Sequence, residues 1–267
     1  MSETTDPTDA AVTATGSVLG CWRYPVKSFQ GLELRSLDIG PTGVLGDRTY
    51  GVMPDGVDRV LSAKTERALL DASADDEGMT LPDGRRLSHA DPEADAVLSE
   101  WLGKPVHLAR AADQSGKTLS YAMTFDPPND DADLFDIPLA DGSFLDLAHV
   151  HLVTTATLAG CADAYPDLNW DVRRFRPNLL LDVDGPTFVE QEWIGRHVQV
   201  GNAVLEVTMP TVRCAMPLRA QPGGLDRQPG LFKAMNELNQ VSPNHLGVYC
   251  SVVTPGLVTI GDAVSPL

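Results

Sequence analysis

A cysteine that follows an arginine is the residue pair best placed for chemistry at sulfur. Cys214 comes directly after Arg213, in a loop that contains Pro210 and ends at Pro217. A neighbouring guanidinium favours the thiolate, the form of cysteine that attacks electrophiles and binds soft metal ions. The alternative is an inert, half-buried thiol, because free cysteines are often part of the core. Cys214 is therefore the candidate nucleophile or metal ligand.

The other three cysteines are Cys21, Cys161 and Cys250, and each lies in an apolar run typical of a core. The chain has no C-x-x-C pair and few cysteines for its length, so a disulfide framework is not expected. This usage suits a reducing compartment, and we predict a cytoplasmic protein.

Several basic residues stand beside Gly, Pro or Ser at the predicted ends of elements, where a side chain can point into a cleft. The candidates are Lys27, Arg48, Lys64, Arg173, Arg174, Arg176 and Arg213. Arginine suits fork-like recognition of phosphate, and lysine suits a point contact. If these residues converge, they form a cationic pocket for a phosphorylated or otherwise polyanionic ligand. The alternative is a set of ordinary salt bridges, which are individually weak.

The overall charge limits the partners of the chain. Its 267 residues include 37 acidic and 20 basic side chains, for a formal net charge of -17. Nucleic acids and anionic membranes bind through cationic surfaces, so neither is expected as a partner. An anionic ligand needs a local basic pocket in a protein that otherwise repels it.

Common catalytic motifs do not occur. There is no G-x-S-x-G, G-x-x-x-x-G-K-[ST], H-E-x-x-H or G-x-G-x-x-G sequence, and no cysteine cluster for an iron–sulfur centre. His149 and His151 alternate as on one strand face, with Cys161 further on, and are a possible metal site. Their spacing matches no standard zinc pattern, so ordinary hydrogen-bonded histidines are the simpler interpretation.

Strand patterns outnumber helix patterns. Helices are predicted from Asp91-Pro92 to Gly103, over 155–164 and around 231–238. Strands are predicted within 18–24, 32–39, 50–53, 151–154 and 178–183, in a hairpin at 197–207 that turns at Gly201-Asn202, and twice within 247–264. We therefore expect a mainly β, α+β fold that is closer to a β-barrel than to a doubly wound parallel sheet.

An acidic stretch divides the chain. Residues 118–172 hold ten Asp and no Lys or Arg, and the Asp-Pro-Pro-Asn-Asp-Asp sequence at 126–131 opposes regular structure. We predict a disordered tail over 1–16 without a signal peptide, an N-terminal domain over 17–117, an acidic linker over 118–147 and a C-terminal domain over 148–267. The alternative for the acidic stretch is a solvated surface with no further role.

The motifs of the second half resemble the MOSC domain, which is the C-terminal domain of molybdenum cofactor sulfurases. The matching segments are 151–158 (HLVTTATL), 174–178 (RFRPN), 192–195 (EWIG), 213–214 (RC), 247–249 (GVY) and 261–264 (GDAV). The first half resembles the N-terminal β-barrel domain that precedes MOSC domains, through 24–28 (YPVKS), 46–48 (GDR) and 62–64 (SAK). The resemblance covers about residues 17–267. It implies a β-barrel-like MOSC domain after a smaller N-terminal β-barrel domain, as in the mitochondrial amidoxime-reducing component and its bacterial relatives.

That resemblance implies a bound molybdenum cofactor, a molybdenum–pterin, with Cys214 as the metal ligand and Arg213 beside it at the catalytic position. The residues implied to bind the cofactor are Lys27, Ser28, Arg48, Lys64, Thr155, Thr157, Arg174, Arg176, Asn178 and Arg213.

The leading functional prediction is an oxidoreductase that reduces small N-hydroxylated or N-oxide substrates. Its electrons come from a separate redox protein with a flavin, haem or iron–sulfur centre, because the chain has no such motif of its own. Two alternatives stay open. One is a sulfurtransferase with a persulfide on Cys214, and the other is a carrier of the molybdenum cofactor.

Overall fold

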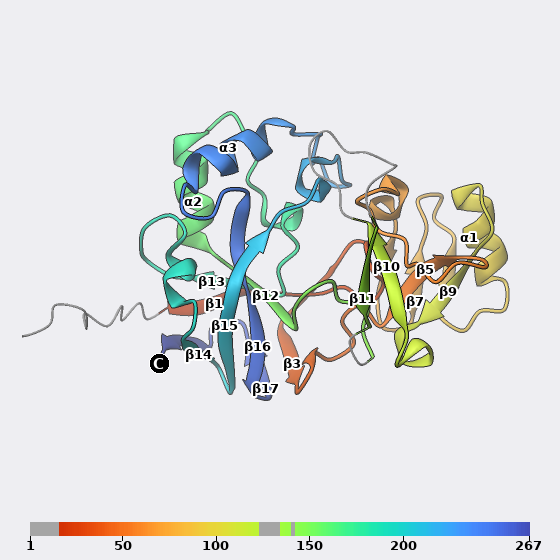
Figure 1. The fold of residues 1–267 in the computed structure, drawn as a ribbon, viewed down its shortest axis with the longest axis horizontal. Helices are drawn as coiled ribbons and strands as arrows, with labels where there is room; N and C mark the ends of the chain where they lie inside the picture. The colour runs from red at the N-terminus through yellow and green to blue at the C-terminus, as the bar shows by residue number, and fades with distance from the viewer. Residues whose placement is uncertain (1–15, 123–133, 140–141) are drawn as a thin grey trace, which may run out of the picture.

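Two lobes built mostly of strands make up the computed structural model, which describes residues 16–122, 134–139 and 142–267 (Figure 1). The larger lobe holds most of the second half of the chain, and the smaller lobe holds the described residues from about 50 to 144. The described part contains three α-helices, and none of them is long and apolar enough to cross a membrane. The expected mainly β, α+β class is confirmed.

The large lobe is a closed barrel of seven strands. In ladder order these are β13 (Leu179–Asp182), β12 (Val150–Thr154), β16 (His245–Thr254), β15 (Ala203–Val212), β14 (His197–Val200), β18 (Ala263–Pro266) and β1 (Gly16–Arg23). The antiparallel pairing of β1 with β13 closes the ring, and β2 (Leu32–Leu34) extends from β1. Alternate residues of these strands point inward and form one apolar core.

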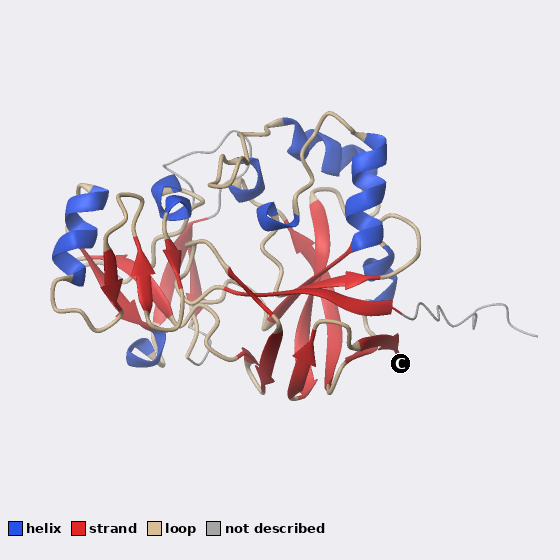
Figure 2. Cartoon of the chain, turned by 180° about the vertical axis from the view of Figure 1, so that it is seen from behind, coloured by secondary structure: helices blue, strands red, loops and turns tan. Residues whose placement is uncertain are grey.

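Helices α2 (Thr155–Ala164) and α3 (Gly230–Leu238) lie together at one end of this barrel (Figures 1 and 2). Thr154 caps α2, because its hydroxyl accepts a hydrogen bond from the Thr157 amide at 3.3 Å. The apolar faces of both helices pack with Trp170 and Phe175 in a second core. The predicted helix over 155–164 and the predicted helix around 231–238 are both present.

Residues 16–23 and 32–44 pair or pack with the barrel lobe, although the N-terminal domain was predicted over 17–117, whereas Val26 and Phe29 between them pack in a core of the small lobe. Besides β1, the strand β3 (Ser36–Gly40) pairs with β17 (Gly256–Thr259), and β4 (Gly43–Val44) pairs with β3. Their inward side chains share the core of the barrel. The sequence suggested otherwise because β13 and β17, the partners of β1 and β3, lie more than 150 residues away, beyond the reach of local patterns.

The small lobe consists of three small sheets around two apolar cores. In one sheet β5 (Tyr50–Pro54) pairs with β9 (Val106–Arg110), and in another β10 (Thr118–Ala122) pairs with β11 (Leu134–Pro138). In the third, β7 (Gly78–Thr80) lies between β6 (Ser73–Ala74) and β8 (Arg86–Ser88). Helix α1 (Ala94–Leu102) packs on this lobe and ends at Gly103, whose φ of 67° is left-handed. The described residues of the lobe form separate ladders rather than one closed ring.

The predicted linker over 118–147 is not a loop throughout. Strands β10 and β11 pair as an antiparallel ladder from Thr118–Pro138 to Ala122–Leu134. The 126–131 sequence lies outside the described residues. Further along, Phe144 is fully buried in the core of the small lobe, which fixes the end of the segment. Alternating Leu119 and Tyr121 side chains supply the apolar face that the acidic composition concealed.

Candidate functional site

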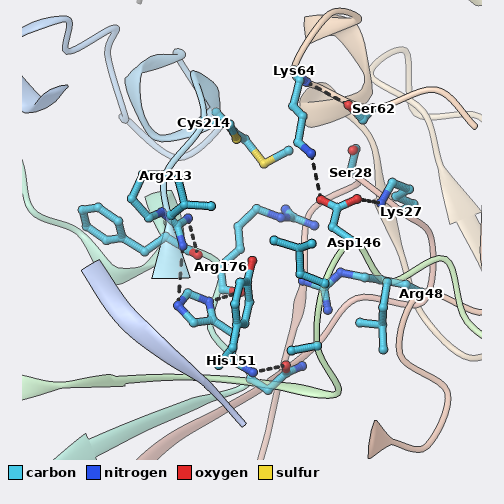
Figure 3. A pocket seen from close by; sticks show the side chains of 18 residues that line it. Lys27, Ser28, Arg48, Ser62, Lys64, Asp146, His151, Arg176, Arg213 and Cys214 are labelled. Carbon is cyan, nitrogen blue, oxygen red and sulfur yellow. Dashed lines mark hydrogen bonds and ion pairs between the residues drawn. The ribbon is translucent and has the colours of Figure 1, made fainter. Parts of the chain in front are cut away.

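A pocket lies where the two lobes meet, and it collects most of the residues that the sequence singled out (Figure 3). It encloses about 820 Å³ of space not filled by atoms, part of it open to solvent. The lining residues are Lys27, Ser28, Arg48, Ser62, Lys64, Leu145, Asp146, Leu147, Ala148, His151, Phe175, Arg176, Asn178, Val212, Arg213, Cys214, Met216 and Tyr249.

Three turns present polar side chains to the pocket in strained backbone conformations. Ser28, Arg48 and Arg176 have φ values of 69°, 52° and 55°, in the left-handed region that non-glycine residues avoid. Ser28 follows β1, Arg48 follows β4, and Arg176 precedes β13. Such conformations persist where the surrounding structure enforces them, and they gather at functional sites. The strain therefore points to this pocket as the working part of the molecule.

Cys214 and Arg213 follow β15 directly, at the edge of the barrel. The Arg213 amide donates to the Asn244 carbonyl at 2.9 Å, and the Asn244 side chain donates back to the Arg213 carbonyl at 2.6 Å. This pair of bonds fixes the backbone next to the thiol. The Cys214 side chain is half-buried and lines the pocket.

The other three cysteines are buried, and their thiols are poor nucleophiles. Burial raises the pKa of Cys161 and of Cys250 to about 12 and that of Cys21 to about 11. Thiolate chemistry in this chain is therefore restricted to Cys214. The expectation that Cys21, Cys161 and Cys250 are core residues is confirmed.

Two lysines and one aspartate form an ion-pair triad on one side of the pocket. The Asp146 carboxylate lies 2.6 Å from Lys27 Nζ and 2.9 Å from Lys64 Nζ. Burial raises the Asp146 pKa by itself, but the two ammoniums outweigh it and hold that pKa well below its usual range. Desolvation lowers the pKa of Lys27 to about 8, although Asp146 opposes it. For Lys64, Asp146 and Cys214 outweigh desolvation, so its pKa is raised.

Two buried guanidiniums lie across the pocket and have no ion-pair partner among the described carboxylates. Arg176 is 6% exposed, its guanidinium carbon lies 4.2 Å from the centre of the Tyr24 ring, and its Nη2 has no hydrogen-bond acceptor in the described residues. Desolvation lowers its pKa to about 10. Arg213 donates to the Phe175 carbonyl at 2.8 Å, but its Nε has no acceptor there either. Buried donors of this kind suit an anionic ligand.

Arg48 reaches the same pocket but carries its own counter-ion. Its guanidinium forms an ion pair with the buried carboxylate of Asp47 and lies 4.7 Å from the Tyr24 ring centre, on which Arg176 also stacks. Tyr24 is buried, and desolvation raises its pKa to about 12, so the ring is a neutral platform that both guanidiniums contact.

His151 is held neutral at the floor of the pocket. Desolvation, and then Arg213, lower its pKa well below the usual value. Its Nε2 lies 3.5 Å from Nη1 of Arg213, and its amide donates to Oδ1 of Asn178 at 3.1 Å. Asn178 also donates to the Trp22 carbonyl at 3.2 Å, so its amide group links β12 to β1. The described residues contain no group of three or more His, Cys, Asp and Glu side chains arranged to hold a metal ion.

The structure places three of the expected cofactor-binding residues outside this pocket. Arg174 is fully buried and donates to the carbonyls of Pro217 and Asp226 at 3.1 and 2.8 Å. Thr155 bonds Asp182 at 3.0 Å, and Thr157 donates to the buried carboxylate of Glu190 at 2.5 Å. These three residues order the surroundings of the site instead of lining it. Arg173 pairs with Asp171 at the surface.

Sequence reasoning missed several lining residues, of which Asp146, Ser62 and Tyr249 carry polar groups. Asp146 stood in the stretch predicted as a linker, and nothing in its neighbourhood distinguished it from the six other aspartates of that stretch. Ser62 and Tyr249 both lie inside segments that carried the family resemblance, 62–64 and 247–249. A role for them was within reach of the motifs.

Comparison with known proteins finds a matching family model and a curated relative. Residues 141–265 match the model of the MOSC domain family. The molybdenum cofactor sulfurase of Danio rerio is 26% identical over 239 residues, and the alignment covers 72% of this chain and 27% of that protein. The chain thus spans about a quarter of the length of that relative.

Two solved structures are also similar to this chain. The YuaD protein from Bacillus subtilis has a TM-score of 0.44 and 12% identity, with 95% of this chain and 96% of that chain covered. YiiM from Geobacillus stearothermophilus has a TM-score of 0.34 and 16% identity, with 45% of this chain and 54% of that chain covered.

Proposed function

We propose that this chain, which carries a MOSC domain and is related to molybdenum-cofactor proteins, binds the molybdenum cofactor in the Cys214 pocket and reduces N-hydroxylated or N-oxide substrates. One observation carries the proposal. The half-buried thiol of Cys214 shares a pocket with two buried guanidiniums, those of Arg176 and Arg213, that lack a carboxylate partner among the described residues.

The donor set of the pocket fits such a cofactor. A thiolate is a soft ligand that suits a molybdenum ion, and Cys214 is the one thiol that can supply it. Arg176 and Arg213 present buried donors without acceptors to an anionic group, which the phosphate of the pterin would satisfy. The hydroxyl of Ser28 accepts a hydrogen bond from the Ala63 amide at 2.9 Å and keeps its own proton for a ligand oxygen.

When bound, the cofactor supplies the two-electron chemistry at the metal, which explains why the chain shows no catalytic triad. The protein contributes binding and orientation. Arg213 is fixed through Asn244 and Phe175, which keeps the adjacent thiol in place. The apolar lining residues Phe175 and Leu145 exclude water from the ligand.

Two partners follow from this function. A small substrate enters from the solvent side of the pocket, and a separate redox protein with a flavin, haem or iron–sulfur centre supplies electrons. The outer surface is more negative than the net charge of -17 suggests, because five basic residues line the pocket. An electron donor therefore docks through a basic or neutral patch, while nucleic acids and anionic membranes are repelled. Four free thiols support the cytoplasm as the compartment.

Sulfur transfer is the second candidate, because the relative from Danio rerio is named a molybdenum cofactor sulfurase. In that function Cys214 carries a persulfide, passes its terminal sulfur to an acceptor and returns to the thiolate. Lys64 interacts electrostatically with Cys214 and would stabilise the anionic sulfur. A third function, storage and delivery of the cofactor, needs the same pocket without turnover.

Metal analysis after expression in a host that makes the cofactor tests the proposal. We expect about one molybdenum per chain in the wild type, loss of the metal in Cys214→Ala, and retention in Cys161→Ala, which removes a buried thiol that does not line the pocket. The reduction of an N-hydroxylated compound with a chemical electron donor then separates the oxidoreductase from the carrier.

A wild-type protein without molybdenum contradicts the proposal. A persulfide on Cys214, found by intact mass, would then support sulfur transfer. Metal that stays bound in Cys214→Ala would show that the thiol is not the ligand.

A further inference from the structure

The Asp146 carboxylate occupies the space between two buried ammoniums on one side of the pocket. One oxygen lies 2.6 Å from Lys27 Nζ and the other lies 2.9 Å from Lys64 Nζ, so each oxygen serves one lysine (Figure 3). Both lysines are 4% exposed, and their side chains enter from the small-lobe side of the site. Asp146 is the one carboxylate among the residues that line the pocket.

The backbone around Asp146 is pinned to the neighbouring turn. The Phe144 amide donates to the Arg48 carbonyl at 2.8 Å, and the Ser143 hydroxyl donates to the Asp47 carbonyl at 2.6 Å. Lys27 Nζ also donates to the Phe144 carbonyl at 2.8 Å. These bonds and the burial of Phe144 fix the backbone beside Asp146, and the two ion pairs hold its carboxylate, so an incoming anion must break those ion pairs to displace it.

Charge in the pocket is therefore divided. Lys27 and Lys64 share Asp146, and Arg48 pairs with Asp47. Arg176 and Arg213 form no ion pair with any described carboxylate. A first anionic group finds the two guanidiniums, whereas a second one, placed near the lysines, meets a fixed negative charge. Like charges brought together in a partly desolvated site repel each other, which weakens binding.

We propose that Asp146 sets the anion selectivity of this pocket by taking the place of a second phosphate or carboxylate between Lys27 and Lys64. The pocket accepts a ligand with one compact anionic group, such as a phosphomonoester, and rejects a ligand that carries a diphosphate or a second anionic group on the lysine side. The inference rests on the proposed function in one respect, that the natural ligand brings an anionic group into this pocket.

Titration calorimetry on the full chain without cofactor tests the inference, with inorganic phosphate and pyrophosphate as the probes. The wild type should bind pyrophosphate no more than about two-fold more tightly than phosphate. Asp146→Asn keeps the shape of the side chain and removes its charge, and it should bind pyrophosphate about ten-fold more tightly than the wild type does, since removal of one like charge is worth at least that factor. Phosphate affinity should rise much less.

Asp38→Asn is the matched control, because Asp38 is exposed on β3 and its loss changes the net charge equally. It should leave both affinities unchanged. An unchanged pyrophosphate-to-phosphate ratio in Asp146→Asn overturns the inference. So does a wild type that prefers pyrophosphate by ten-fold or more, a result that needs no variant and holds even if Asp146→Asn does not fold. If the protein binds no molybdenum but shows the expected pyrophosphate-to-phosphate affinity ratios, the proposed function is wrong and this inference still holds.

Discussion

Arg176 should lower the stability of the protein in the absence of a ligand, and its removal should raise it. Desolvation lowers the pKa of its guanidinium from 12.5 to about 10. This difference corresponds to about 3 kcal/mol that disfavours the charged side chain in the folded state, because each pKa unit is worth 1.36 kcal/mol. A base whose pKa is lower in the folded state destabilises that state at every pH below both values, so the full amount applies at pH 7.

The variant Arg176→Met keeps an unbranched side chain in the same place. It loses the cation–π contact with Tyr24, which is worth up to about 2 kcal/mol when desolvated. The remaining gain in the free energy of unfolding is about 1–2 kcal/mol, or a few degrees in Tm. The same variant should lose at least ten-fold in affinity for sulfate, a divalent anion that does not titrate near neutral pH.

Arg174 provides the contrast, because it is equally buried but satisfied. Its guanidinium donates to the carbonyls of Pro217, Arg219 and Asp226 at 2.8–3.4 Å. Arg174→Met leaves these carbonyls without a donor, each at a cost of about 1–3 kcal/mol. The loss in unfolding free energy should therefore be about 3 kcal/mol or more. Urea denaturation at pH 7 measures both variants. If Arg176→Met loses as much stability as Arg174→Met, its guanidinium is structural and the anion site is refuted.

Three further outcomes follow from single side chains. Sulfate affinity should fall as pH rises from 7 to 9, because Lys27, with a pKa of about 8, loses its charge; calorimetry on Lys27→Met should find a weaker and pH-independent affinity. Gly247→Ala should lower the unfolding free energy by about 2 kcal/mol or more in urea denaturation, because Gly247 has a φ of +79° and an added Cβ would lie 2.6 Å from His151 Nε2. Gly103→Ala is the control: its φ of +67° is similar but an added Cβ meets open space, so the same assay should find a loss of about 1 kcal/mol. Burial raises the pKa of Glu190, so the wild type should lose stability as pH rises above 4.5; a Glu190→Gln variant with the same slope in denaturation series from pH 4.5 to 8 would contradict this.

Local sequence patterns predicted much of the barrel but not its closure. The hairpin of β14 and β15 turns at Gly201-Asn202 as expected, and α2 covers Thr155–Ala164, the range predicted for a helix. The pairing of β1 with β13, which includes Cys21 and Leu179, closes the ring. Neither segment's local pattern indicates that it pairs with the other. For this reason β1 and β3 were grouped with the N-terminal domain, although they pair with strands from the second half of the chain.

In the site too, the sequence identified the residue types but not the direction in which their side chains point. Arg174 and Arg176 stand in one motif and have the same chemistry, yet only Arg176 reaches the pocket. The 3-10 turn Val172–Arg174 points the first side chain toward the loop after Cys214, while the left-handed backbone of the second turns it the other way. Asp146 was missed for a different reason: its importance lies in two lysines that are 82 and 119 residues away.

Strained backbone conformations and buried unpaired charges, both unfavourable for folding, occur together at this pocket. Neither stabilises the chain in the absence of a ligand. Five described non-glycine residues have positive φ, and Ser28, Arg48 and Arg176 among them line it. Each costs about 1 kcal/mol or more. The turns belong to different parts of the chain and are held by separate bonds, such as Arg48 N to the Tyr24 carbonyl at 2.6 Å and Arg176 N to the Val172 carbonyl at 3.2 Å.

The buried guanidiniums of Arg176 and Arg213 add to this cost. An anion bound between them would restore the missing acceptors and reverse the desolvation term, so the pocket becomes favourable only when it is filled. The location of the strain and the location of the unpaired charge thus lead to the same conclusion independently. The rest of the chain is built to hold a cationic site ready at the junction of the two lobes, inside a protein whose net charge is -17.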